Sequence, residues 1–178
     1  MLPDDARRLL VELARDSVTA RVTGARATVA PSSAFPTASG VFVTVKVRGE
    51  LRGCLGTLDC RDLGTDVARC AADAASKDPR FPPIATTELQ SLTVEVSVLG
   101  PLERIDPGDP AAIAIGGHGL VVEQGRHRGL LLPQVASERR WSREEFLDQT
   151  CVKADLRSDA WRFGATVYRF SADVFGDD

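Results

Sequence analysis

The residue of this chain best placed to do chemistry is Cys54, a cysteine between two glycines in residues 51–57 (LRGCLGT). Glycines on both sides remove side-chain bulk and let another group approach the main chain. The charge of Arg52 would stabilise the thiolate of Cys54 if the two groups lie close, and amides around Gly53 and Gly56 could hold an anion. We interpret Cys54 as a candidate nucleophile or redox thiol, and Arg52, Gly53 and Gly56 as candidate substrate-binding residues.

The same motif also has a purely structural interpretation. Glycines within a strand mark a bulge or a helix that packs unusually closely, and a free cysteine often behaves as a small buried hydrophobe. A second, fainter motif, residues 128–131 (RGLL), has Leu130 where the first has Cys54. An apolar slot filled by different residues would explain both motifs, so the two interpretations stay open.

Two further residues are candidates to assist the thiol. His118 lies between two glycines, which would let it swing into a cleft as a base, and a Cys54–His118 pair would form an activated nucleophile. Glu95 interrupts an apolar run and shares the polar face of its strand with Thr93 and Ser97, where it could orient a histidine or bind a cation. The alternatives are a histidine bound by backbone in a turn and a glutamate that faces water.

A stiff loop at residues 78–83 (DPRFPP) is the last candidate. Its prolines would hold Arg80 and Phe81 in fixed directions, so that Arg80 could form part of a ligand rim. The alternative is a packed crossover that Phe81 anchors in the core.

The apolar pattern predicts the elements that would position these residues. We expect helices over 4–22, 62–76 and 142–153, strands over 41–47, 50–57, 92–99, 113–115, 120–123, 128–132 and 166–170, and an irregular segment over 25–39. The helix at 142–153 begins with a capping box, Ser142 with Glu145. Because hairpin, helix and strand follow one another twice, we predict an α+β fold of antiparallel hairpins with covering helices, built on a duplicated ββαβ unit.

Composition excludes several classes of function. The 178 residues suit one domain, and a net charge of −3 without a Lys/Arg run argues against nucleic-acid binding. We expect no membrane span, because no apolar run is long enough, and a cytoplasmic protein, because the first residues do not resemble a signal peptide. Four cysteines without a CxxC pair and two histidines predict no metal site.

The chain resembles the AMMECR domain family over nearly its whole length. The matching motifs occur in the same order, at residues 51–57, 78–83, 94–99, 118–120 and 129–136. The resemblance implies a single domain over residues 1–178, an α+β fold with a larger and a smaller lobe, and an unsettled biochemical activity. The most characteristic family motif falls on Arg52, Gly53, Cys54, Gly56 and Thr57, which adds Thr57 to the candidate binding residues. At Asp155 this chain departs from the family, which often has glycine there.

Microbial members of the family resemble protein A of the AmmeMemoRadiSam system, which implies a Memo-type protein and a radical-SAM enzyme as partners. The iron–sulfur cluster and SAM would belong to a partner, because this chain has no suitable cysteine triplet, and we expect no cofactor here. Two hypotheses follow. In one, Cys54 is a reactive thiol with a lowered pKa, aided by Arg52 and by His118 or Glu95; in the other, the chain is a binding or assembly module in which the Cys54 hairpin is structural.

Overall fold

The computed structural model describes residues 1–27 and 34–177, and the chain divides into two compact units. Unit 1 comprises Met1–Leu99 with Asp173–Asp178, and unit 2 comprises Gly100–Ala172. A larger and a smaller part are therefore confirmed, whereas the expectation of a single domain over residues 1–178 stays a prediction. Part of the irregular segment expected over 25–39, residues 28–33, lies outside the described residues.

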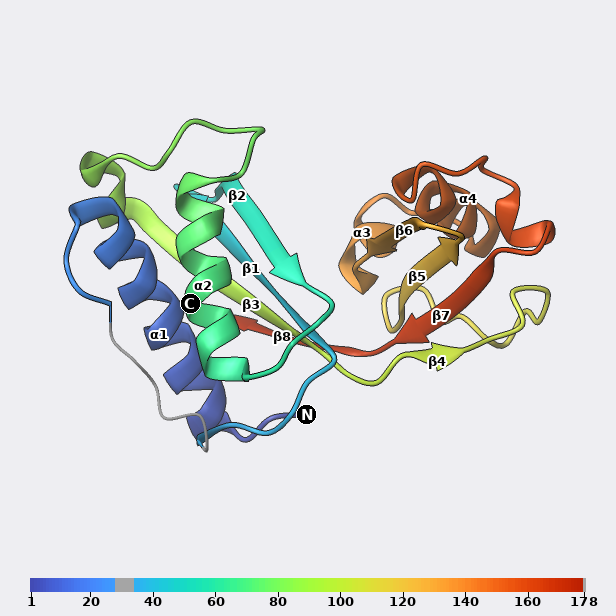
Figure 1. Ribbon diagram of the computed structural model, residues 1–178, viewed down its shortest axis with the longest axis horizontal. Coiled ribbons are helices and arrows are strands. Elements are labelled where there is room, and N and C mark those ends of the chain that lie inside the picture. The colour runs from blue at the N-terminus through green and yellow to red at the C-terminus, as the bar shows by residue number, and fades with distance from the viewer. Residues whose placement is uncertain (28–33, 178) are drawn as a thin grey trace. The chain divides into compact units, whose positions relative to one another are not determined.

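Unit 1 is a four-stranded sheet with helices on one face (Figure 1). Its elements are α1 (Asp4–Thr23), β1 (Gly40–Val47), β2 (Glu50–Thr57), α2 (Leu63–Ser76), η2 (Thr86–Ser91), β3 (Leu92–Leu99) and β8 (Ala172–Gly176), with sheet order β2-β1-β3-β8. Alternation in β1 puts Val41, Val43 and Val45 on the helix-covered face, where all three are fully buried. Thr44 and Lys46 consequently lie on the opposite face.

Unit 2 repeats this plan with a second four-stranded sheet. Its elements are β4 (Glu103–Arg104), β5 (Gly119–Gln124), β6 (His127–Leu131), α3 (Pro133–Glu138), α4 (Arg143–Lys153), η3 (Ala160–Arg162) and β7 (Thr166–Phe170), with sheet order β4-β7-β5-β6. The core forms between the sheet and α4, around Val122, Phe146 and Trp161. The predicted capping box is confirmed, because Ser142 N donates to Glu145 Oε2 at 2.7 Å and Glu145 N donates to Ser142 Oγ at 3.2 Å.

The duplication predicted from the sequence is visible in the topology of the two sheets. The order β2-β1-β3 in unit 1 corresponds to β6-β5-β7 in unit 2, and all these pairs are antiparallel. Val45 pairs with Gly53 in the first hairpin and Val122 with Gly129 in the second. An ideal Cβ on either glycine would meet the backbone of a helix or its end, at Ala74 O and Ala154 N. The α+β fold of antiparallel hairpins with covering helices is thus confirmed.

Several short elements differ from the prediction, and β4, η2, α3 and η3 were not predicted. The strand expected over 113–115 is wrong, because these residues form a turn-containing loop. Pro133 begins helix α3 at its first turn, where the missing N–H of proline costs nothing. Strand β8, which follows β7 after one residue, was not predicted, since residues 172–176 alternate too weakly to show it. Within the described ranges, no helix has both the length and the apolar character that crossing a bilayer requires.

Candidate functional site

Cys54 lies on β2, the edge strand of the unit 1 sheet, in a row of side chains that crosses three strands. Thr44 on β1 pairs with Cys54 on one side and with Glu95 on β3 on the other. Side chains of directly paired residues lie on the same face, here the one opposite the buried valines. Thr44 Oγ1 donates to Cys54 Sγ at 3.3 Å, and Lys46 Nζ lies 3.5 Å from Glu95 Oε2. The sheet therefore brings Cys54 and Glu95 onto one polar face, with Thr44 between them.

The space beside Gly53 is filled by helix α2. An ideal Cβ on Gly53 would lie 1.9 Å from Ala74 O, and one on Gly56 would lie 2.4 Å from both the Phe42 ring and Val41 O. These glycines are needed for close packing within unit 1, as the structural interpretation of the motif expected. Their role in substrate binding stays a prediction.

The main-chain amide of Cys54 is bound by a carboxylate that the sequence did not single out. Asp78 Oδ2 accepts from Cys54 N at 3.0 Å, and the Asp78 side chain is only 2% exposed. The same carboxylate also accepts from Arg80 N and Nε, both at 3.1 Å, and from an Arg80 terminal nitrogen at 2.8 Å. Asp78 thus fastens the 78–83 loop to the edge of β2 and fixes Arg80 beside it.

Arg80 and Arg52 have different partners. The guanidinium of Arg80, a side chain 55% exposed, lies 5.3 Å from the centre of the Phe81 ring and is held by Asp78. Arg52, the unpaired residue at a register shift in β2, donates from Nε and a terminal nitrogen to the two carboxylate oxygens of Glu88, at 2.8 and 3.0 Å. Arg52 is therefore committed to Glu88, and Arg80 provides the positive charge near the thiol.

Burial raises the pKa of the Cys54 thiol above its ordinary value. The hydrogen bond from Thr44 and the charge of Arg80 act in the opposite direction, while the charges of Asp78 and Glu95 add to the increase. The lowered pKa expected for a resting thiolate is therefore wrong. The Asp78 carboxyl behaves differently, because its hydrogen bonds with Arg80 hold its pKa far below the usual range.

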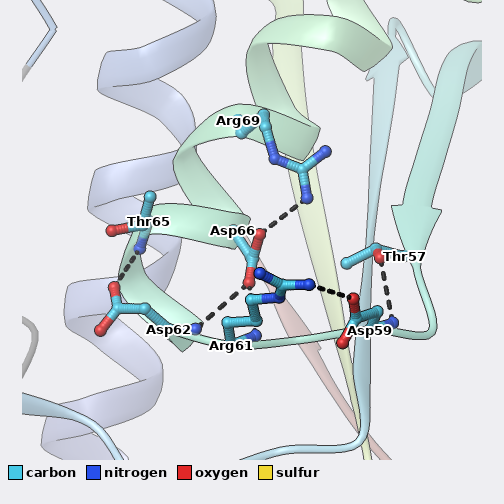
Figure 2. Close-up of polar contacts among 7 residues, drawn as sticks. All are labelled: Thr57, Asp59, Arg61, Asp62, Thr65, Asp66 and Arg69. Atoms are coloured by element: carbon cyan, nitrogen blue, oxygen red, sulfur yellow. Dashed lines mark hydrogen bonds and ion pairs between the residues drawn. The ribbon is translucent and has the colours of Figure 1, made fainter.

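Thr57 is part of a hydrogen-bonded turn between β2 and α2. Thr57 Oγ1 accepts from Asp59 N at 3.1 Å, and the Asp66 carboxylate accepts from Asp62 N and Arg69 (Figure 2). Asp62 caps α2 by accepting from Thr65 N at 2.8 Å. The hydroxyl of Thr57 is thus engaged in local structure, and a binding role for it stays a prediction.

His118 belongs to unit 2, whereas Cys54 and Glu95 belong to unit 1. Its Nδ1 accepts from Ala114 N at 3.0 Å, in a turn where His118 N donates back to Ala114 O. Burial and the charge of Arg169 lower the pKa of His118, so the ring is neutral at pH 7. This is the backbone-bound histidine that the sequence left open as an alternative, and the Cys54–His118 pair stays a prediction.

No cluster of three or more histidine, cysteine or acidic side chains in the described ranges has the arrangement of a metal site. The residues that sequence reasoning missed are Thr44 and Asp78. Thr44 could have been found from the alternation of β1, which puts it on the polar face. The one feature of the sequence that could have indicated Asp78 is its position directly before Pro79 in a stiff loop. Its hydrogen-bond partner, the amide of Cys54, lies 24 residues away in the sequence and could not be identified from it.

The chain is similar to proteins of several other organisms. It is 43% identical over 186 residues to a protein of Methanothermobacter thermautotrophicus, covering 99% of this chain and 97% of the relative. It is also 43% identical to protein TK0174 of Thermococcus kodakarensis over 191 residues, covering 99% and 93%. The crystal structure of uncharacterized protein PH0010 from Pyrococcus horikoshii matches with a TM-score of 0.88 at 39% identity, covering 99% of this chain and 94% of that one. The AMMECR1 family model matches residues 11–175, and the chain therefore belongs to the AMMECR1 family.

Proposed function

We propose that this protein is a binding component of a modification pathway of the AmmeMemoRadiSam type, with a Memo-type protein and a radical-SAM enzyme as its partners. The observation that favours binding over catalysis is the resting state of Cys54. Burial raises the pKa of this thiol and outweighs the opposing hydrogen bond that Thr44 donates to the sulfur, so the thiol is protonated at neutral pH. All four cysteines are free, which is consistent with the reducing cytoplasm that we propose as its location.

The contact surface in this proposal consists of Cys54, Thr44, Glu95 and the Arg80–Phe81 pair. Arginine and aromatic side chains are enriched among residues that dominate protein interfaces. Arg80 is half exposed yet held in place by three hydrogen bonds to Asp78. A partner would bind a side chain that is already ordered, which lowers the entropic cost of association.

Arg80→Ala is expected to weaken binding to at least one of the two partners by about tenfold, since it removes an ordered arginine from the contact surface. The partners are the Memo-type and radical-SAM proteins of the same organism, and affinity is measured by calorimetry with the full chain. Arg61→Ala is the matched control, because Arg61 is 84% exposed on the same unit and its guanidinium pairs with Asp59 on the surface. Failure of the wild-type chain to bind either partner, or equal losses in the two variants, would contradict the proposal.

A reactive Cys54 is the second candidate function, favoured by the incomplete burial of this residue and by the nearby charge of Arg80. In the resting protein we expect iodoacetamide to modify Cys54 more slowly at pH 7 than it modifies free cysteine. The rate should increase as pH rises beyond 9, because only the thiolate reacts and burial disfavours it. Mass spectrometry of tryptic peptides gives the rate at each cysteine.

The other three thiols are internal controls for this measurement. Burial raises the pKa of Cys60 to about 12 and that of Cys70 to about 11, and Cys151 is fully buried. These three should react more slowly than Cys54 in the folded chain. Modification of Cys54 at pH 7 faster than free cysteine would instead show an activated thiol and favour the catalytic candidate.

A further inference from the structure

Strand β6 is the edge of the unit 2 sheet and occupies the place that β2 has in unit 1. A two-residue turn joins β5 and β6, so Gln124 and His127 form the hydrogen-bonded pair that closes the hairpin. Hydrogen-bonded and non-hydrogen-bonded pairs then alternate along the two strands, and the next hydrogen-bonded pair is Val122 with Gly129. Leu130 falls between two such pairs. Its N–H and C=O therefore point away from β5, as do those of Arg128.

The corresponding amide in unit 1 has an acceptor. Cys54 N, which is equivalent to Leu130 N by register, donates to the carboxylate of Asp78 at 3.0 Å. Over residues 1–27 and 34–177, the side chains and turns provide no such acceptor for Leu130 N. At the edge of β2, the Asp78 carboxylate thus binds the outward amide of Cys54. At the equivalent edge of β6, the amide of Leu130 is available to a hydrogen-bond acceptor of another molecule.

A cavity of about 480 Å³ lies beside this edge. Its lining includes Leu131, Val135, Arg139, Trp141, Val152 and Lys153. Val152 is 50% exposed although it is apolar, and Trp141 is half-buried. The cavity therefore offers an aliphatic and aromatic wall next to a strand edge, which is what recognition of an extended peptide requires.

The charged residues at the cavity favour an acidic ligand. Arg139 lies 5.5 Å from the centre of the Trp141 ring, and neither Arg139 nor Lys153 forms an ion pair within the described part of the chain. Asp155 is the acidic residue in the lining. Two cations against one carboxylate leave a net positive charge beside the apolar wall.

We propose that β6 and this cavity bind an extended acidic peptide segment of a partner protein by strand addition. The peptide backbone pairs with the outward N–H and C=O groups of Arg128 and Leu130. One apolar side chain of the peptide enters the cavity and contacts Trp141 and Val152. The carboxylates of the neighbouring acidic residues of the peptide face Arg139 and Lys153. This site lies in unit 2 and does not depend on the surface proposed around Cys54.

The probe is the acetylated, amidated hexapeptide Glu-Thr-Val-Thr-Glu-Thr, whose valine and two glutamates share one face of an extended strand, titrated into the ¹⁵N-labelled full chain. We expect shifts of the Leu130 and Arg128 amide signals, and no shift of the Cys54 amide signal, which Asp78 already binds. Arg139→Glu should lower the affinity for the peptide by about fivefold or more, because it replaces an attractive charge by a repulsive one. Arg126→Glu, the same change at the exposed β5–β6 turn, should alter affinity by less than about twofold.

Two peptide controls separate strand addition from nonspecific attraction. A hexapeptide with lysine in place of glutamate should bind more weakly, and one N-methylated at every residue should not pair with the strand edge. No shift at Leu130 with millimolar peptide would overturn the proposal. Equal binding of the N-methylated peptide, or equal losses in Arg139→Glu and Arg126→Glu, would overturn it as well.

Discussion

Replacing Gly53 by alanine is expected to lower the free energy of unfolding by about 3 kcal/mol or more. The new Cβ would lie 1.9 Å from Ala74 O, a backbone atom of α2. A flexible side chain could rotate out of the way, but a helix backbone must shift together with the core that it covers. The change in stability is measured by urea unfolding, followed by far-ultraviolet circular dichroism.

Gly117→Ala is the matched control for this substitution. Its Cβ would meet nothing closer than 3.5 Å, an ordinary van der Waals contact, so the change should stay within about 0.5 kcal/mol. Gly129→Ala should resemble Gly53→Ala, because its Cβ would lie 2.4 Å from Ala154 N. If Gly53→Ala were as stable as Gly117→Ala, the close contact between β2 and α2 would be refuted.

The elements of both units could be predicted because their signals are local. The alternation of Val41, Val43 and Val45 determines which face of β1 is buried, and the Ser142–Glu145 box determines where α4 begins. The order of these elements was enough to predict the duplication. Short elements such as β8 could not be predicted, because five residues on a sheet edge carry little apolar periodicity.

The candidate site could be predicted only in part. The spacing around Cys54 located the strand, and the polar face of β3 located Glu95. Gly53 packs against the backbone of α2, and a contact with a helix backbone cannot be predicted from the pattern of residue types. The charge near the thiol comes from Arg80 and not from the adjacent Arg52, because Arg52 pairs with Glu88, 36 residues further along the chain.

Asp78→Asn is expected to lower the free energy of unfolding by about 2 kcal/mol at pH 7. The carboxylate is nearly fully buried and accepts four hydrogen bonds, one from Cys54 N and three from Arg80. An asparagine has a single acceptor oxygen and no charge, so it cannot satisfy both partners. Because Arg80 is half exposed and can be hydrated, the loss should stay below that of a fully buried ion pair. Urea unfolding at pH 7 gives the value, and Asp59→Asn, at a side chain 76% exposed, should change it by less than about 0.5 kcal/mol.

The pH dependence of the same variant identifies the carboxylate as the cause. The pKa of Asp78 is lowered in the folded chain, so its contribution to stability is complete above the unfolded pKa of about 4 and declines as pH falls toward the folded value. The difference between wild type and Asp78→Asn should therefore be constant from pH 7 to about 5 and shrink below about 4. A difference that is the same at pH 7 and pH 3 would mean that the variant acts through packing and that the charge of Asp78 does not hold the loop against β2.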